Sequence, residues 1–396
     1  MRDLQPLIAS LLPELVELRH DLHRHPELGY EEHETAARIV SQLQDVPGIE
    51  LRTGVAGTGV VATLGAERAG ACVALRADMD ALPIEELGDH AHCSTVPGKM
   101  HACGHDGHVT CLVGAARVLA QMGDELEGPV KFLFQPAEEG GAGGRRMCEE
   151  GVLDDPPVRA IFGLHGWPGQ PQGEIGVRSG AMLASSDRLR IAVHGTGAHA
   201  AFPHQGIDTV LVAAHVVLAL QSIAARNTDP LDSVVVTIAQ VHGGTADNII
   251  PGEVRLSGTV RTLNSETRRL TFERIERVAA ETARAYGATA EVTLDDGYPV
   301  LENDPDATDY VRRVAAAAGG TVPVEIRPGM GGEDFAFYAQ RVPASFFTLG
   351  VCPVDRDTYP TLHQPDYDFH DGAIALGVAM HVEIARRFWR EGPQAT

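Results

Sequence analysis

The sequence predicts an α/β protein in which a mainly parallel sheet carries helices on both faces and a smaller α+β domain is inserted. Apolar runs of strand length alternate with helical patterns in the first part of the chain. Near residue 185 the pattern changes to alternating polar and apolar residues, and after residue 299 the first pattern returns. A chain of 396 residues is also too long for one ordinary hydrophobic core, so we expect two domains.

The first domain is predicted from strands and helices that follow one another. ACVAL at 71–75, VKFLF at 130–134 and AIFGL at 160–164 have the length and composition of buried strands. The segment 108–122 places its apolar residues on one face at helical spacing, and the N-terminal segment is an amphipathic helix rather than a signal peptide. Strands that alternate with helices indicate a largely parallel sheet.

The inserted domain is predicted from three alternating segments and two long helical patterns. DRLRIAVHG, SVVVTIAQVHGG and EVRLSGTVRT indicate a sheet with one solvated face. The helical patterns cover 206–226 and 264–286. Beyond GYPVLENDP we expect a helix at 305–318 and a strand at ASFFTLG. The predicted domains are therefore 1–186 with 300–396, and 187–299.

Composition excludes several classes of protein. A formal charge of −22 without a basic cluster argues against nucleic acid, whose binding depends on clustered Lys and Arg. Six cysteines in a chain of this length do not indicate a disulfide scaffold, and the absence of a C-x-x-C pair weakens the case for a structural zinc site. We expect no apolar run near the roughly 18 residues that span a bilayer, hence no membrane partner and a cytoplasmic protein.

The stretch MHACGHDGHVT at 100–110 holds one cysteine, one aspartate and three histidines. Such a stretch is compatible with half of a structural zinc site, with a cysteine nucleophile and its base, or with part of a catalytic metal centre. Cys103 and His105 lie two residues apart, so both can point into one pocket from an extended segment. Asp106 is expected to cap the following helix, with His101 and His108 in supporting roles.

Further candidate ligands follow the predicted strands. The carboxyl ends of strands in an open α/β sheet form the ligand crevice, and the residues there are Asp78, Asp80, Glu138, Glu139, His165 and, after a short loop, His363. Two metal ions about 3.5–4 Å apart need a bridging ligand, which a carboxylate or thiolate can supply. The neighbours Glu138 and Glu139 cannot both face one ion easily, which suggests one ligand and one general base.

Several longer strings occur in order along almost the whole chain: LHRHPELGYEE, RADMDALPI, MHACGHDGH, QPAEEG, GLHGWP, GTGAHAAFPHQGID, DNIIPGE, GTVRT, MGGEDFAFY and LHQPDYDFHD. Through them the chain resembles the M20 metallopeptidase family. The most similar branch contains hippurate hydrolases, N-acyl-amino-acid deacylases and plant auxin-conjugate hydrolases. The resemblance implies a catalytic domain with an inserted lid or dimerisation domain.

The resemblance also implies two divalent metal ions, which can be Zn, Mn, Co or Ni. Cys103 would bridge them. Glu139 and His363 would complete the ligands of one ion, and His105 and His165 those of the other.

Many relatives carry a histidine where this chain has Asp78, and His105 would supply the missing imidazole. Asp80 would then orient a metal ligand. Glu138 would be the general base that acts on metal-activated water. His199 would stabilise the negative charge that develops on the amide oxygen, in relatives often from a partner subunit.

Substrate contacts are expected from four residues. Asn248 and Arg261 match positions that hold the substrate carboxylate in relatives, and a guanidinium suits a carboxylate because it donates two parallel bonds. Alternatively, Arg261 pairs with an acid on its own strand. Gly331 and Gly332 would let the backbone approach the substrate, or would form an ordinary turn before a helix.

The predicted function is hydrolysis of the amide bond of N-acyl amino acids, hippurate-like or N-acetylated, by a homodimer or homotetramer. A dipeptidase or carboxypeptidase of the same fold is the first alternative. A thiol hydrolase that uses Cys103 with His105 or His165 is another, and a metal-binding relative without turnover is the third.

Overall fold

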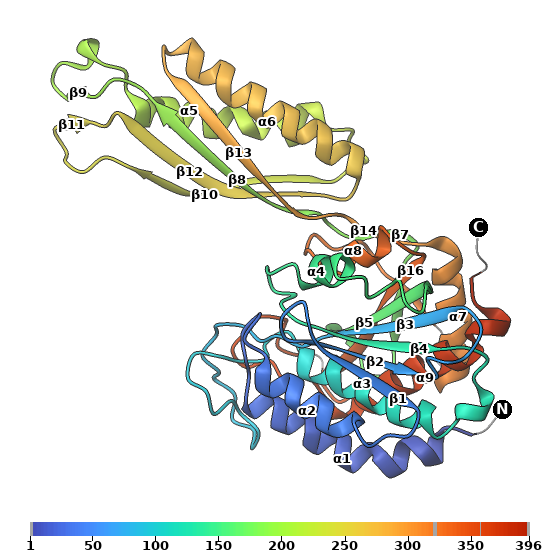
Figure 1. Cartoon of the computed structure of the whole chain (residues 1–396). Helices are drawn as coiled ribbons and strands as arrows, with labels where there is room; N and C mark the ends of the chain where they lie inside the picture. Colours follow the sequence, from blue (N-terminus) through green and yellow to red (C-terminus); the bar gives the residue numbers. More distant parts are fainter. Residues whose placement is uncertain (1–2, 320–322, 357, 394–396) are drawn as a thin grey trace. The chain divides into compact units, whose positions relative to one another are not determined.

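The computed structural model describes residues 3–319, 323–356 and 358–393. The chain forms two compact units (Figure 1). Unit 1 consists of Met1–Gly180, Glu302–Arg327 and Asp334–Thr396, and unit 2 of Ala181–Leu301 and Pro328–Glu333. The expected limits at 187 and 299 fall near these boundaries, and the structure adds the short segment before Asp334 to the inserted unit.

Unit 1 is built on an eight-stranded sheet in the order β1-β2-β4-β3-β5-β16-β6-β15. Strand β3 pairs in parallel with β4 and β5, and β16 pairs in parallel with β5, whereas β1 and β2 are antiparallel. This confirms the predicted mainly parallel sheet. The strands are β1 (Ile49–Val55), β2 (Gly59–Leu64), β3 (Cys72–Asp78), β4 (Val130–Gln135), β5 (Val158–Pro171), β6 (Ile175–Val177), β15 (Val324–Glu325) and β16 (Ala344–Cys352).

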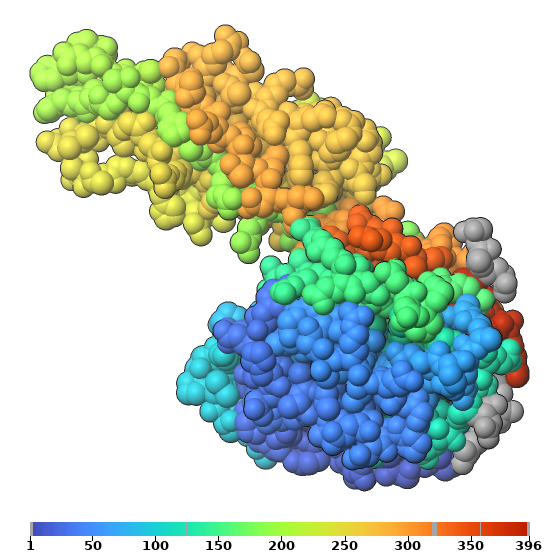
Figure 2. All heavy atoms as spheres, viewed as in Figure 1, coloured from blue at the N-terminus to red at the C-terminus, as the bar shows by residue number. Residues whose placement is uncertain are grey.

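Helices cover both faces of this sheet. Figure 1 shows α1, α2 and α3 on one side and α4 and α8 on the other. The central strands are buried on both faces, which explains why they are apolar throughout rather than alternating. Figure 2 shows that the first quarter of the chain, in blue, forms most of the visible surface of unit 1. The helices are α1 (Gln5–Arg24), α2 (His33–Leu43), α3 (His105–Ala120), α4 (Gly143–Glu149), α7 (Pro305–Gly319), α8 (Ala336–Ala339) and α9 (Ile374–Glu391).

Unit 2 contains an antiparallel sheet in the order β10-β12-β8-β13, with α5 and α6 packed against it. Alternate residues of β8 are buried, as the sequence pattern predicts. Asp208 caps α5 by accepting hydrogen bonds from two backbone amides at 3.1 Å. The elements are β8 (Ser186–His194), β10 (Val234–Gly243), β12 (Glu253–Thr262), β13 (Thr289–Tyr298), α5 (Thr209–Ser222), α6 (Ser265–Ala285) and the two-stranded ribbon of β9 (Ala198–His199) and β11 (Ile249–Ile250).

The expectation that no apolar run approaches the length of a membrane span is wrong. The segment Thr209–Asn227 is long and apolar enough to cross a membrane by length and composition, with a mean hydropathy of 1.6. Val212, Val216 and Leu220 on this helix pack into the core of unit 2, whereas Leu218 is exposed. A single helix of this kind is weak evidence for a membrane, because the core helix of a globular domain passes the same test.

The expected helix cap at Asp106 is also wrong. Helix α3 begins at His105, and its N-cap is Gly104, with a left-handed backbone at φ 85° and no side-chain cap. Asp106 instead lies in the first turn, where its Oδ2 is 2.9 Å from Nδ1 of His23 in α1. A long-range ion pair with α1 therefore replaces the local capping bond.

Candidate metal centre

Cysteine, histidine and glutamate side chains gather in unit 1 beside the ends of β3 and β4. His165 does not follow a strand as expected, because β5 continues past it to Pro171. Cys103 lies in the loop before α3, and Gly104 turns the chain directly after it. A side chain at Gly104 would meet the Tyr367 hydroxyl at 3.0 Å, so both the conformation and the space favour glycine. This turn places Cys103 and His105 in one buried cluster.

Two groups of candidate ligands share Cys103. One contains Cys103, His105 and His165, and the other contains Cys103, Glu139 and His363. Within each group one donor atom per residue lies within 4.8 Å of the others. These are the two sets that the family resemblance implies, and Cys103 occupies the shared position.

The orientation of His165 is fixed by its own neighbour. Nδ1 lies 2.8 Å from the carbonyl oxygen of Gly166, which accepts the ring proton. Nε2 is therefore left as the nitrogen that can bind a metal ion, and it lies 3.4 Å from Sγ of Cys103. A backbone carbonyl commonly selects the tautomer of a metal-binding histidine in this way.

The buried polar atoms of this cluster are compatible with a bound cation. Neither ring nitrogen of His105, nor Oε1 of Glu139, has a hydrogen bond of normal geometry among the described residues, although Asp80 lies 3.3 Å from the first residue and His363 3.2 Å from the second. Burial raises the pKa of the Cys103 thiol well above its usual value, and the nearby Glu139 and Glu138 carboxylates raise it further. A thiolate here needs a positive charge beside it, which a divalent ion would supply.

The surroundings of His105 also carry a surplus of negative charge. Burial alone would lower its pKa, but the surrounding Asp78, Asp80 and Glu139 carboxylates raise it to about 10. A bound cation would take the place of that proton.

Asp80 connects the two glutamates to the histidine. Its Oδ1 accepts a hydrogen bond from the backbone amide of Glu138 at 3.0 Å, and its Oδ2 accepts one from that of Glu139 at 2.9 Å. Oδ1 also lies 3.3 Å from Nδ1 of His105. Asp80 therefore positions the loop after β4 and one imidazole at once, which is how an orienting carboxylate acts.

Two strained residues flank the cluster. Ala137, directly before Glu138, has φ 52°, and His363 has φ 67°. Left-handed backbone is costly for residues with a side chain and concentrates at functional sites. The side chain of His363 is 52% exposed, and its Nε2 lies 3.2 Å from Oε1 of Glu139, so the cluster has one solvent-facing side.

The two flanking histidines differ in role. Nδ1 of His108 lies 2.6 Å from Oδ1 of Asp78, and Nε2 accepts the Gly166 amide at 2.8 Å, so both nitrogens are engaged within the fold. Neither nitrogen of His101 has a hydrogen-bond partner among the described residues, so the expected supporting role of His101 through a donated hydrogen bond is not observed. Burial lowers the pKa of His101 to about 4 and keeps the ring neutral.

A buried network that sequence reasoning missed supports Glu138. The Arg76 guanidinium bonds Asp78 at 2.8 Å and Asp334 at 2.9 Å, and Gln135 donates to both oxygens of Asp334. The backbone amide of Asp334 in turn lies 3.3 Å from Oε1 of Glu138. The buried position of Arg76 within an apolar strand was the available signal, because a buried guanidinium requires carboxylate partners.

The other predicted site residues belong to unit 2. His199 pairs with Ile249 across the β9–β11 ribbon, and the carbonyl of Asn248 accepts the Ala200 amide at 3.0 Å. His199 and Asn248 are therefore neighbours, and both are exposed.

Arg261 and the two glycines have distinct surroundings in unit 2. Among the described residues no carboxylate lies within ion-pair distance of Arg261, and its Nη1 donates to the Val260 carbonyl at 3.1 Å. The alternative of a strand ion pair is therefore not observed. A side chain at Gly332 would lie 2.6 Å from Cβ of Ser186, whereas the space beside Gly331 is open.

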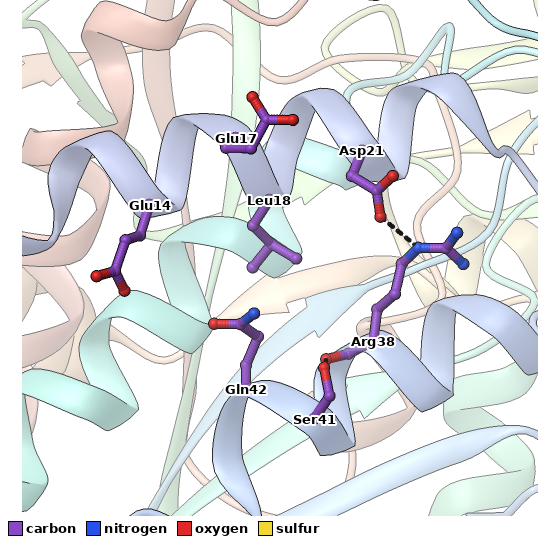
Figure 3. Close-up of a pocket in the computed structure, with 7 residues that line it drawn as sticks. All are labelled: Glu14, Glu17, Leu18, Asp21, Arg38, Ser41 and Gln42. Carbon is purple, nitrogen blue, oxygen red and sulfur yellow. Dashed lines mark hydrogen bonds and ion pairs between the residues drawn. The ribbon is translucent and has the colours of Figure 1, made fainter.

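A separate hollow of about 390 Å³ lies between α1 and α2 (Figure 3). Arg38 crosses it and donates to Asp21 at 2.6 Å. The lining residues are Glu14, Glu17, Leu18, Asp21, Arg38, Ser41 and Gln42. This set contains neither cysteine nor histidine and is separate from the cluster around Cys103.

A mainly parallel α/β sheet with thiol, imidazole and carboxylate groups at its strand ends defines a metal-dependent hydrolase. Residues 74–387 match the model of peptidase family M20/M25/M40. The chain belongs to this family, as the sequence strings indicate.

Relatives and a solved structure agree with this assignment. The chain is 40% identical to the N-acetyl-L-cysteine deacetylase of Bacillus subtilis, over 96% of this chain and 89% of that protein. It is also 40% identical to IAA-amino acid hydrolase ILR1-like 4 of Arabidopsis thaliana, over 95% and 86%. The crystal structure of the Bacillus subtilis YXEP protein, described as a dinuclear metal-binding peptidase of the M20 family, superposes with a TM-score of 0.85 at 35% identity, over 97% and 99%. The chain is thus a hydrolase of the family.

Proposed function

We propose that this protein hydrolyses the amide bond of N-acyl amino acids, hippurate-like or N-acetylated, to a carboxylate and a free amino acid. The observation that carries the proposal is the pair of ligand groups that share Cys103 beside Glu138. Names of relatives support the substrate class, since one is an N-acetyl-L-cysteine deacetylase and another an IAA-amino acid hydrolase.

Five residues would hold two divalent ions, which can be Zn, Mn, Co or Ni. Cys103 would be shared, with Glu139 and His363 on one side and His105 and His165 on the other. Ions bound there would polarise the amide carbonyl and make water more acidic.

Glu138 has the position of a general base. It is buried beside the ligands and held by Asp80 and Asp334. Its carboxylate takes a proton from the attacking water as the new C–O bond forms, and delivers that proton to the amine as the C–N bond breaks. Asp80 positions Glu138, Glu139 and His105 and does not itself exchange a proton.

The residues of unit 2 are assigned to the substrate. His199 would donate a hydrogen bond to the developing oxyanion. The guanidinium of Arg261, which donates to the Val260 carbonyl and is near enough to Asp187 for an electrostatic interaction, would bind the α-carboxylate together with Asn248. Gly331 and Gly332 would line the approach of the substrate backbone.

A homodimer or homotetramer in the cytoplasm is the proposed form, with unit 1 as the catalytic domain and unit 2 as the lid and dimerisation domain. Exposed apolar side chains of unit 2 support association, and they include Val210, Leu211, Leu218, Val241 and Ile249. Nucleic acid and membrane are not proposed as partners.

The experiment that tests the function is a hydrolysis panel on metal-analysed protein. N-benzoyl, N-acetyl and dipeptide substrates with the same amino acid are compared by kcat/KM. The proposal expects the acylated amino acids to be preferred. A preference for dipeptides would favour the alternative, a dipeptidase or carboxypeptidase, which the description of the YXEP protein as a peptidase supports.

A further inference from the structure

A second cluster of metal-binding side chains lies in unit 1, where the segment 83–99 meets the end of α1. His23 comes from α1, and Glu86 and His90 come from the segment, which contains neither helix nor strand. The segment 83–99, in light blue, lies at the surface of unit 1 in Figure 2. A loop of this length inside a compact domain usually has a function or a device that holds it.

Two imidazoles converge on one carboxylate oxygen. Nε2 of His90 lies 2.9 Å from Oε1 of Glu86, and Nε2 of His23 lies 3.2 Å from the same atom. Zinc binds such ligands at about 2.0–2.2 Å, which places tetrahedral ligand atoms about 3.3–3.5 Å apart. Both histidine nitrogens therefore lie near the required spacing from the carboxylate oxygen, and all three atoms lie within 4.8 Å of one another.

Supporting contacts orient two of the three side chains. Nδ1 of His23 lies 2.9 Å from Oδ2 of Asp106, which directs Nε2 toward Glu86. The second oxygen of Glu86 accepts the backbone amide of Ser94 at 2.5 Å. In metal sites a ligand histidine commonly donates its other ring N–H to a carboxylate, and a ligand carboxylate commonly accepts a hydrogen bond on its other oxygen.

The cluster is buried on one side and open on the other. The side chains of His23, Glu86 and His90 are 0%, 4% and 20% exposed. Nε2 of His90 is buried and has no hydrogen bond of normal geometry, although Glu86 is close. An ion that entered beside His90 would bind this nitrogen in place of its present contact with Glu86.

A neighbouring trio, His90 with His92 and Asp368, is the weaker candidate. Nη2 of Arg19 lies 2.7 Å from Nε2 of His92, and the Arg19 guanidinium pairs with Asp368. That fixed positive charge repels a cation. The trio that remains is His23, Glu86 and His90.

We propose that His23, Glu86 and His90 form a third metal site, separate from the centre around Cys103, which binds a zinc-like transition-metal ion and fastens the segment 83–99 to α1. Two imidazoles and one carboxylate suit Zn²⁺, Co²⁺ or Ni²⁺ rather than Mg²⁺ or Ca²⁺. A water molecule would complete the coordination on the open side.

The test is a Zn²⁺ titration of metal-free full-length protein against a chromophoric chelator. Wild type should bind one more equivalent of Zn²⁺ than His90→Gln. In the variant the Zn²⁺ affinity of the proposed site should fall by about 100-fold or more, since losing a supporting contact alone costs 10–100-fold. His33→Gln is the matched control, because His33 is an exposed histidine at the start of α2. Equal stoichiometry and affinity in wild type and His90→Gln would overturn the proposal.

A measurement on wild type alone guards against misfolding of the variant. Saturation at three equivalents of Zn²⁺, with slower amide hydrogen exchange in 83–99 as the last equivalent binds, is the expected result. Saturation at two equivalents, or a third equivalent that leaves exchange in this segment unchanged, would contradict the proposed site.

Discussion

Sγ of Cys103 lies 3.4 Å from Nε2 of His165, whose other ring nitrogen faces the carbonyl of Gly166. The thiol also belongs to the ligand group on the opposite side, with Glu139 and His363. A single buried sulfur thus connects the two groups. On this ground we propose Cys103 as the bridge of one dinuclear centre rather than a ligand of two independent sites.

Replacing Glu138 with glutamine should leave metal binding intact and reduce kcat by roughly 10²–10⁴-fold, the usual contribution of proton transfer. The amide keeps the shape of the side chain but does not take a proton from water. Metal content and kcat are measured on the same preparation. Near-normal kcat with full metal content would remove Glu138 from the role of base.

Asp80→Asn should weaken metal binding by about 10–100-fold, the typical effect of losing an orienting carboxylate. An asparagine offers one acceptor oxygen where the carboxylate oxygens of Asp80 accept the amides of Glu138 and Glu139. Asp45→Asn, at an exposed position outside both metal-binding clusters, is the control. Unchanged affinity in the chelator titration would show that Asp80 does not position the ligands.

Arg261→Ala should raise KM for substrates with a free α-carboxylate and affect kcat less. The reason is that a guanidinium binds a carboxylate through two parallel charge-assisted bonds. Substrates with an amidated carboxyl group are the comparison. If their KM rises by the same factor, Arg261 does not bind the carboxylate.

His23 should make the stability of the metal-free protein depend on pH. Burial lowers the pKa of His23, but Asp106 and Glu86 outweigh this and raise it to about 9. A raised pKa means that the stabilisation is complete below the unfolded value near 6.5 and is lost as the pH rises through about 9. The loss is on the order of 3 kcal/mol.

The free energy of unfolding is measured with a chelator present between pH 6 and about 10, a range that covers both pKa values. His23→Gln should remove this part of the pH dependence, and His33→Gln should retain it. An identical slope in His23→Gln and wild type would contradict the assignment.

Much of the fold follows from local patterns. The apolar runs of β3 and β4 predict strands buried on both faces, and the alternation in β8 predicts a sheet with one solvated face. Glu138 and Glu139 could be placed because they follow a strand that ends at one edge of a parallel sheet, whereas His165 lies within β5.

What could not be predicted depends on contacts between distant residues. Aspartate is a residue type that commonly caps helices, so the local sequence predicts a capping role for Asp106. In the structure its partner is His23, which lies 83 positions away. Arg76 within an apolar strand signals a need for carboxylate partners, but no local pattern identifies Asp334, 258 positions away, as one of them. The cluster of His23, Glu86 and His90 likewise exists only because the segment 83–99 folds back onto α1.

The most direct test of the dinuclear centre is metal analysis of Cys103→Ala in a His90→Gln background, so that the second cluster adds no ion. Cys352→Ala in the same background is the control for loss of a thiol elsewhere. Because both ligand groups lose their shared member, we predict fewer than two tightly bound ions per chain. Two tightly bound ions in Cys103→Ala would contradict the assignment of Cys103 as the bridge.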